Sequence, residues 1–197
     1  MPVSTPRPGF QFSVSLSVAG LLSSLVASDL YALPFATGRA GGGYTYGEGD
    51  QGDAASGGMA SAIGRFGYLF DEYKSFIAVD INAYRFYSNK AMKSNMDGNN
   101  ALLVYGYEYS GSTFWIAAGA GEIRSYDRAA DKATPYRYYV VEQQLGYSYQ
   151  LYSADYARVE IGVQLDRMTP DNEWKAKTGL KSLNSLEFDV GFKLLNW

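Results

Sequence analysis

The sequence predicts an all-β protein, an eight-stranded antiparallel up-and-down β-barrel of the transmembrane type, with short turns at one end and longer loops at the other. Three observations lead to this fold. Eight segments alternate apolar and polar residues with a period of two, as strands with one buried face do. These segments exceed the roughly five or six residues of most strands in globular proteins. Their connections alternate between long and short along a chain of 197 residues, a length that suits one domain.

The clearest strand is predicted over 186–194. Its apolar face is formed by alternate residues, namely Leu186, Phe188, Val190, Phe192 and Leu194. The opposite face carries Glu187, Asp189, Gly191 and Lys193. In a soluble protein the apolar face would cover a core. In a membrane barrel the apolar face meets lipid and the charged face meets the lumen.

Seven further strands are predicted upstream, at about 33–46, 60–70, 76–87, 101–109, 113–126, 139–151 and 157–166. The connections are predicted to be alternately long and short, at 47–58, 71–75, 88–100, 110–112, 127–135, 152–155 and 169–184. Strands of this length cross a bilayer when they are tilted. The alternation is typical of an even-stranded barrel with short periplasmic turns and long external loops.

Aromatic residues, which make up 16% of the chain, gather at both ends of the predicted strands. The short-turn end collects Phe66, Tyr68, Phe70, Tyr73, Phe76, Tyr105, Tyr107, Tyr109, Phe114, Trp115, Tyr147, Tyr149, Tyr152, Tyr156 and Trp197. The long-loop end collects Tyr44, Tyr46, Tyr84, Phe86, Tyr87, Tyr126, Tyr136, Tyr138 and Tyr139. Two aromatic belts around an aliphatic band are typical of two membrane–water interfaces. The plainer alternative is that aromatic residues simply favour strands.

Composition excludes several kinds of chemistry. The chain has neither Cys nor His, so disulfides, thiolate metal sites and a Ser-His-Asp triad are excluded. A net charge of −3 without a basic stripe gives no basis for nucleic-acid binding. We therefore expect no catalytic residue, no cofactor and no metal site.

Residues 1–28 fit a secretory signal peptide, which would leave 29–197 as a single β-barrel domain. Arg7 precedes an apolar, Ser-rich run over 10–27, and Val26-Ala27-Ser28 supplies small residues at a cleavage point. The alternative is an extra N-terminal strand, because residues 10–18 also alternate apolar and polar side chains.

Polar residues on the faces opposite the apolar ones are predicted to form a network inside the barrel. This lumen network consists of Asp80, Glu142, Gln144, Arg158, Glu160, Asp166, Glu187, Asp189 and Lys193. Charges of both signs pair when they lose water, so the network would fill a lumen too narrow for water flow. The functional alternative is a proton-linked or glycosidase-like pair of carboxylates.

The chain resembles the small eight-stranded outer-membrane β-barrels of Gram-negative bacteria, of the OmpA and OmpX type, over about residues 30–197. The resemblance rests on the architecture and on the terminal stretch 189–197. That stretch is similar to the C-terminal signal that such barrels present to the barrel-assembly machinery, through Gly191, Phe192, Leu194 and Trp197. Trp197 departs from the pattern, because it is out of phase with Phe192 and Leu194. The resemblance implies the cell outer membrane as the location and lipopolysaccharide as a neighbour.

A second resemblance is to BcsS-type proteins of bacterial cellulose operons, in the layout around 101–109 and 139–165. No specific motif carries it. The lipid A deacylase, palmitoyltransferase, phospholipase and omptin families of outer-membrane barrel enzymes use a histidine, which this chain lacks.

The leading hypothesis is a non-enzymatic outer-membrane barrel whose external loops contact lipopolysaccharide, a polysaccharide or another protein. Lys175, Lys177 and Lys181, together with Arg85, are candidates for contact with lipopolysaccharide phosphates. The second hypothesis is a soluble or periplasmic lipocalin-like barrel, in which the apolar faces would line a cavity for an apolar ligand. The third is a β-rich subunit of a larger assembly, with strands 10–18 and 186–194 paired between chains.

Overall fold

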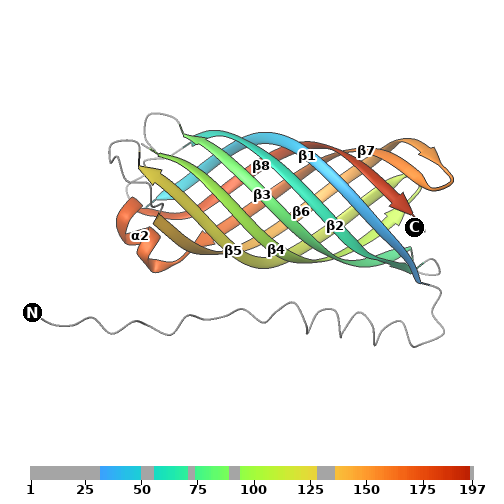
Figure 1. The fold of residues 1–197 in the computed structure, drawn as a ribbon, viewed down its shortest axis with the longest axis horizontal. Coiled ribbons are helices and arrows are strands. Elements are labelled where there is room, and N and C mark those ends of the chain that lie inside the picture. The colour runs from blue at the N-terminus through green and yellow to red at the C-terminus, as the bar shows by residue number, and fades with distance from the viewer. Residues whose placement is uncertain (1–31, 50–55, 71–73, 89–93, 128–135, 196–197) are drawn as a thin grey trace, which may run out of the picture.

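A closed barrel of eight antiparallel strands makes up the computed structural model, which describes residues 32–49, 56–70, 74–88, 94–127 and 136–195. The strands are β1 (Ala32–Gly49), β2 (Ser56–Phe70), β3 (Ser75–Ser88), β4 (Ser94–Tyr109), β5 (Ser112–Asp127), β6 (Tyr136–Ala154), β7 (Ala157–Pro170) and β8 (Leu180–Leu195). A helix, α2 (Asn172–Thr178), lies between β7 and β8. Figure 1 shows α2 at one end of the barrel, whereas β1 begins and β8 ends at the opposite end. The predicted fold class is confirmed.

The strand register determines the tilt and width of the barrel. Following paired residues once around the barrel from Thr37 leads to Gly47, ten residues further along β1. A shear of ten over eight strands corresponds to a tilt of about 40°. The interior of such a barrel is just wide enough for side chains to fill it.

β8 has no free edge, because it pairs with β7 on one side and with β1 on the other. The assembly-subunit hypothesis would pair this strand between chains, and its edges are already occupied within the chain. The other segment that this hypothesis uses, 10–18, lies outside the described residues, as does the predicted signal peptide.

The apolar faces of the strands point outward and the polar faces point inward. On β8, Phe188 is 62% exposed and Val190 is 58% exposed, whereas Glu187 and Asp189 are buried. The same alternation runs along the other strands. The lipocalin-like hypothesis requires the reverse, with the apolar faces around an internal cavity, and the structure does not have that arrangement.

Two predicted loops contain more regular structure than the sequence indicates. The sequence predicts a loop over 88–100, but β4 begins at Ser94, and the predicted loop over 169–184 contains α2 and the start of β8. Beyond the apolar wall the outward residues Asp97 and Asn99 of β4 are polar, so the hydrophobic alternation fades while backbone pairing continues through both of them. The connections at the α2 end are therefore shorter than predicted, although they remain longer than those at the other end.

At the end opposite α2, which is called the short-turn end below, the structure describes two of the chain reversals completely, those at 110–111 and 155–156. Ser110 and Gly111 have φ angles of 50° and 81°, and two successive positive φ angles are typical of a type I′ hairpin. The register shifts between Gln150 and Tyr152, and β6 extends to Ala154. An extra residue in one strand displaces the pairing. As a result the turn before β7 lies at 155–156, later than predicted.

Apolar side chains fill both ends of the barrel interior. The cluster at the α2 end, called the α2-end cluster below, consists of Met59, Tyr84, Phe86, Met96, Ile123, Tyr138, Val140, Met168, Trp174, Leu180 and Leu183. The cluster at the short-turn end consists of Phe35, Leu69, Phe76, Ala78, Leu102, Val104, Trp115 and Ala117. The prediction of a lumen plugged by polar side chains therefore covers only part of the filling, because inward positions near the strand ends are apolar.

Five aromatic residues that the sequence assigns to the outer belts point inward instead, namely Phe76, Tyr84, Phe86, Trp115 and Tyr138. The alternation of the strand decides this, because each of them shares a face with a buried polar residue of its own strand. Tyr73 and Trp197 lie outside the described residues, as do the side chains of Tyr126 and Tyr136. The outward aromatic residues at the short-turn end include Tyr107, Tyr109, Phe114, Tyr152 and Tyr156.

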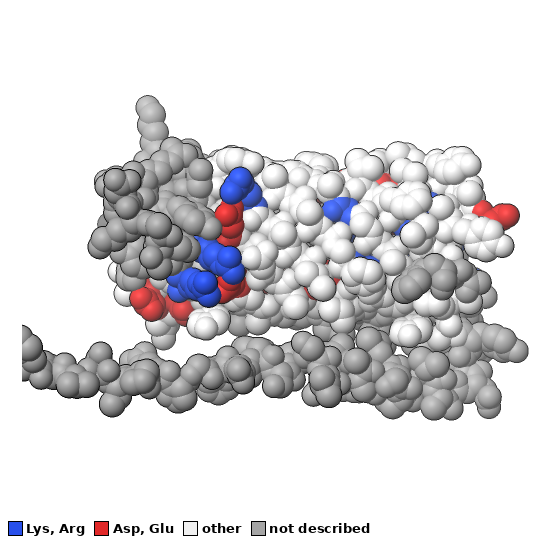
Figure 2. Space-filling model, viewed as in Figure 1, with Lys and Arg blue, Asp and Glu red and all other residues white. Residues whose placement is uncertain are grey.

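The outer wall is apolar over a height that matches a bilayer. On β7 the first charged outward residue after Ala157 is Arg167, ten residues further on. At about 3.3 Å per residue and a tilt of about 40°, this stretch spans roughly 25 Å, which is the height of the apolar band in outer-membrane barrels. Figure 2 shows the charged side chains gathered toward the α2 end of a largely uncharged wall. Within the described ranges, none of the helical structure is long and apolar enough to cross a membrane.

Candidate functional site

The nine residues of the predicted lumen network all lie on the inward faces of β3, β6, β7 and β8. Eight of them are buried, and Arg158 is partly exposed near the short-turn end. The network forms three layers along the barrel axis. Lys193, Asp189 and Glu187 on β8 mark these layers, in order from the short-turn end toward α2.

The layer nearest the short turns is an ion cluster around Glu108. Lys193 and Arg158 both pair with this carboxylate, and the distance from Arg158 Nη1 to Glu108 Oε2 is 2.9 Å. Lys193 Nζ also lies 4.5 Å from the centre of the Phe35 ring. Glu160 belongs to the same region, and a polar cavity of about 200 Å³ reaches Glu108, Arg158 and Glu160 from the short-turn end. Two cations therefore share one carboxylate at this end of the lumen.

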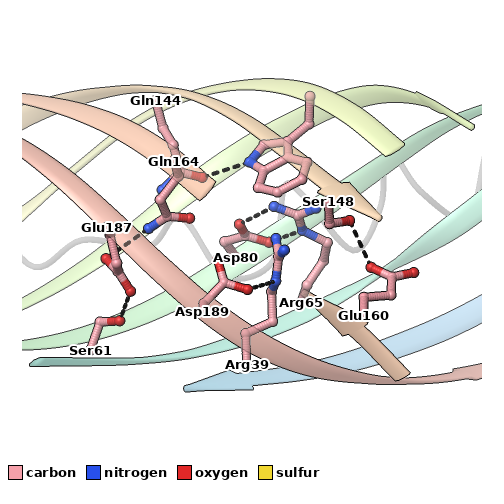
Figure 3. Close-up of polar contacts among 11 residues, drawn as sticks. Arg39, Ser61, Arg65, Asp80, Gln144, Ser148, Glu160, Gln164, Glu187 and Asp189 are labelled. Carbon is pink, nitrogen blue, oxygen red and sulfur yellow. Dashed lines mark hydrogen bonds and ion pairs between the residues drawn. The ribbon is translucent and has the colours of Figure 1, made fainter. Parts of the chain in front are cut away.

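Two buried arginine–aspartate pairs form the middle layer (Figure 3). Arg65 donates from Nε and Nη2 to the two oxygens of Asp80, at 2.7 and 2.8 Å. Arg39 Nε lies 2.9 Å from Asp189 Oδ1. All four side chains are buried. Each charge depends on its partner here, because an unpaired charge in the interior is strongly destabilising.

Trp115 on β5 connects the two arginine–aspartate pairs. Its ring centre lies 4.3 Å from the guanidinium carbon of Arg39 and 4.5 Å from that of Arg65. Both distances are within the range of cation–π interactions. The indole Nε1 donates to Gln144 Oε1 at 3.0 Å. Gly146 on the neighbouring strand makes room for the ring, since a Cβ atom at this position would overlap the indole.

The layer nearest α2 contains three carboxylates whose partners are neutral. Glu142, Asp166 and Glu187 lie on β6, β7 and β8, and each is a diagonal neighbour of the next in the strand register. Tyr84 donates to Glu142 Oε1 at 2.6 Å from the opposite side of the barrel. Asn100 donates to the second oxygen of the same carboxylate. Glu142 therefore links three strands across the lumen.

Amides and a hydroxyl group bind the other two carboxylates of this layer. Gln144 Nε2 donates to Asp166 Oδ1 at 2.8 Å, and Gln164 Nε2 donates to Glu187 Oε2 at 2.9 Å. Ser61 also donates to Glu187, from β2. These bonds connect β2, β6, β7 and β8, so the layer crosses the whole lumen.

The carboxylate layer holds more acceptors than donors. In the described part of the chain, its buried oxygens without a hydrogen-bond partner are Asn82 Oδ1, Asn100 Oδ1, Gln164 Oε1 and Asp166 Oδ2. Within the same part, the ion pairs that the structure contains use other carboxylates, among them Asp80 and Asp189. The lumen thus combines carboxylates that arginine neutralises with carboxylates that only neutral groups contact.

In the described part of the chain, buried side chains flank the carboxylate layer on both sides along the barrel axis. The α2-end cluster lies on one side of it, and the two arginine–aspartate pairs lie on the other. A glycosidase-like pair needs carboxylates on the two sides of a bound sugar, whereas these carboxylates are buried and bound by neighbouring side chains. Across the described ranges, no group of three or more acidic side chains is arranged to hold a metal ion.

Three central residues of the lumen, Arg39, Arg65 and Trp115, are missed by the sequence-based network. Glycines surround Arg39 in β1 and hide its alternation with Thr37, and the Ala- and Gly-rich sequence of β5 leaves the facing of Trp115 open. Arg65 carries a usable signal, because it lies on the face opposite Phe66 in a clear period-two pattern.

The residues predicted for assembly and for lipopolysaccharide contact take separate positions. Phe192 and Leu194 point outward near the end of β8 and Gly191 points inward, while Trp197 lies outside the described residues. Lys175 lies in α2 and Lys181 is exposed on β8. The side chain of Lys177 is not among those described. Arg85 pairs with Asp97 at 2.9 Å, so its charge is already compensated.

Comparison with solved structures finds the same fold. The crystal structure of Neisserial surface protein A (NspA) matches with a TM-score of 0.51 and 14% identity, over 84% of this chain and 99% of that chain. The N-terminal β-barrel domain of Pseudomonas aeruginosa OprF has a TM-score of 0.44 and 15% identity, over 80% and 96% of the two chains. The outer membrane protein OprG of Pseudomonas aeruginosa has a TM-score of 0.37 and 11% identity, over 81% and 95%.

No protein-family model and no curated protein matches the sequence. The likeness to NspA confirms the resemblance to eight-stranded outer-membrane barrels at the level of the fold. The resemblance to BcsS-type proteins finds no support in these comparisons.

Proposed function

We propose that this chain is a non-enzymatic β-barrel of the outer membrane, closed to solute flow, which contacts its surroundings through the α2 end. The observation that carries the proposal is the polarity of the barrel, with an apolar wall of roughly 25 Å outside and ion pairs inside. In water, such a continuous apolar wall would be a large exposed patch. In a bilayer, the wall is solvated by lipid.

The layered filling of the lumen supports a closed barrel. The Glu108 cluster, the arginine–aspartate pairs and the carboxylate layer occupy successive levels, and Trp174 of α2 covers the far end. The Trp174 ring packs against Tyr138 with 4.9 Å between ring centres. Asp171 caps the helix, because its side chain accepts a hydrogen bond from Trp174 N at 2.9 Å. These contacts fix the position of the helix at this end of the barrel, which supports the proposed closure.

The lengths of the connections support an orientation with α2 on the cell surface and the short turns in the periplasm. Lipopolysaccharide, a polysaccharide or a protein is the proposed partner at the surface end. The end of β8, with Gly191, Phe192 and Leu194, followed by Trp197, is the proposed signal for the barrel-assembly machinery. No nucleic acid is proposed as a partner, in keeping with the net charge of −3.

Conductance measurements test the closed lumen. Purified protein, folded in detergent and shown to migrate faster before heating than after it, should give only background conductance in planar bilayers. A stable open channel of defined conductance would contradict the closed lumen. Release of the protein from cell membranes by aqueous buffer without detergent would contradict the membrane location.

A charge on the outer wall tests the bilayer contact. Val190 is 58% exposed and lies near the middle of the apolar wall, so Val190→Arg should lower the free energy of unfolding in lipid vesicles by about 2–4 kcal/mol. Thr169→Arg, also outward but at the α2 end, is the matched control and should cost about 1 kcal/mol or less. Equal costs for the two variants in urea titrations would contradict a bilayer around this wall.

A further inference from the structure

We propose that the outer wall of β5, β6 and β7 binds the lipid A portion of lipopolysaccharide near the α2 end, with a phosphate between Arg124 and Arg137 and an acyl chain in the groove next to them. The proposal rests on the proposed function, because this end meets the lipopolysaccharide leaflet only if α2 lies on the cell surface. It assigns a site on the barrel wall, apart from the loop lysines that the sequence suggests.

Two arginine side chains face outward side by side at this position. Arg124 on β5 and Arg137 on β6 are directly opposite each other in the strand register. Their neighbours Ile123 and Tyr138 are buried, so both arginine side chains belong to the outward set. Side chains directly opposite each other in a ladder have Cβ atoms about 5 Å apart, and like charges in such a pair destabilise it. An anion between the two guanidinium groups would remove this repulsion.

The protein compensates only part of this positive charge. Arg124 donates from Nε to Glu122 Oε1 at 2.7 Å. Arg137 is exposed and forms no ion pair with any residue of the described ranges. On the other side of Arg124, Asp97 is bound by Arg85 through two hydrogen bonds, at 2.9 and 3.3 Å. The uncompensated charge of this row is therefore at Arg137.

A largely apolar groove of about 530 Å³ begins two positions further along the strands, at the paired residues Glu122 and Tyr139. Its walls include Ala120 and Glu122 on β5, Tyr139 and Val141 on β6, Thr169 and Pro170 on β7, and Asp171. Both carboxylates are already bound, because Glu122 accepts from Arg124 and Asp171 accepts from two backbone N–H groups. Small residues on β5 leave the space open, and the groove lies where the apolar wall ends and the charged residues begin. Acyl chains end and phosphate groups begin at this level of a bilayer.

The combination of charge and groove favours a phosphorylated lipid over a free anion. Guanidinium groups bind phosphate oxygens through paired hydrogen bonds, but phosphate alone would leave the apolar groove unfilled. An uncharged lipid would fill the groove and leave Arg137 without a partner. A lipid with a phosphate head and acyl chains satisfies both, and lipid A is such a molecule in the leaflet that this end is proposed to face.

Native mass spectrometry of the full chain in detergent tests the site, with added bis-phosphorylated lipid A, lipid A from which the phosphates have been removed, or phosphatidylglycerol as probes. The wild type should retain bis-phosphorylated lipid A most strongly. The Arg124→Gln/Arg137→Gln variant should retain it about tenfold less well, because charge-assisted bonds to the phosphate are lost. Ala120→Trp, which fills the groove, should reduce retention while both arginines remain.

Arg167→Gln is the matched control, since Arg167 is also an outward arginine at this end but lies opposite Gln143 and Asn184, not opposite a second arginine. It should retain lipid A as the wild type does. Equal retention by the double variant, equal retention of the dephosphorylated lipid, or a preference for phosphatidylglycerol would each overturn the assignment. Membrane fractionation and heat-dependent migration are measured on the same variants, so loss of the lipid site is distinguished from failure of the outer-membrane proposal.

Discussion

Asp80→Asn is expected to lower the free energy of unfolding by about 3–5 kcal/mol, because the variant leaves the Arg65 guanidinium buried without a counter-charge. Both side chains are almost completely shielded from solvent, because 4% of the Arg65 side chain and 0% of the Asp80 side chain are exposed. Solvent therefore cannot replace the lost carboxylate. The measurement is unfolding by urea in lipid vesicles, followed by tryptophan fluorescence and by heat-dependent migration.

Glu142→Gln is the matched comparison for this experiment. Glu142 is as deeply buried as Asp80, but its hydrogen bonds come from Tyr84 and Asn100, which are neutral. The glutamine keeps the shape and removes a buried charge, and its amide donates to Asn100 Oδ1 when the Asn100 amide turns over, an oxygen that has no partner in the described part of the chain. We expect a cost of about 1 kcal/mol or less, or a gain in stability.

Equal losses for Asp80→Asn and Glu142→Gln would contradict the distinction between the arginine-paired and the neutral-paired carboxylates. The Arg65→Met/Asp80→Leu variant provides a second measurement, because it removes both charges together. It should recover much of the stability that Asp80→Asn loses, since apolar residues of similar volume often replace a buried ion pair without loss. Conductance of the same variants reports whether the middle layer also blocks solute flow.

Trp115→Ala is expected to cost about 3–5 kcal/mol, because it leaves a cavity in the middle of the lumen. The substitution also removes a hydrogen bond to Gln144 and the ring that lies near both Arg39 and Arg65. Unfolding in lipid vesicles measures the loss, with intrinsic fluorescence corrected for the missing tryptophan.

Gly146→Val tests the same contact from the other strand, since its side chain would overlap the Trp115 ring. This variant should also lose several kcal/mol. In the double variant Trp115→Ala/Gly146→Val, the valine fills space that the ring has left, so the combined cost should be clearly smaller than the sum of the two single costs. Additive costs would contradict direct packing of the ring against Gly146.

Gly38→Val is the control for a glycine replaced by valine in a strand. A Cβ atom at Gly38 would meet no atom within 4 Å, and the position faces outward. Because valine is favourable on an exposed apolar strand face, we expect a change of about 1 kcal/mol or less. A loss as large as that of Gly146→Val would show that the backbone at glycine positions, rather than the lumen packing, sets the cost.

Strand number and strand facing could be predicted from the sequence because the signal for both is local. Leu186 to Leu194 alternate on β8 regardless of their neighbours, and each internal strand with a period-two pattern takes the predicted facing. The limits of a strand cannot be predicted where the alternation of apolar and polar residues weakens. The sequence misses the start of β4 at Ser94, because residues 94–100 contain one large apolar residue, Met96, and no alternation.

The filling of the lumen depended on distances that the sequence does not contain. Arg39 and Asp189 are 150 positions apart, and only the closure of β8 on β1 places them 2.9 Å from each other. Lys193 and Glu108 are 85 positions apart, and they meet across the lumen. Local alternation indicates that such residues face inward, but it does not indicate which of them form pairs.

The sequence by itself determined that this protein has eight strands with one apolar and one polar face, since strand geometry imposes a period of two on every segment. Only the tertiary structure decided which charges form pairs, which inward side chains meet across the lumen and where α2 lies. The physical reason is that the sheet closes into a barrel when β8 pairs with β1. A shear of ten around eight strands sets the height of every inward side chain relative to all the others, and that height determines the partner each side chain can reach.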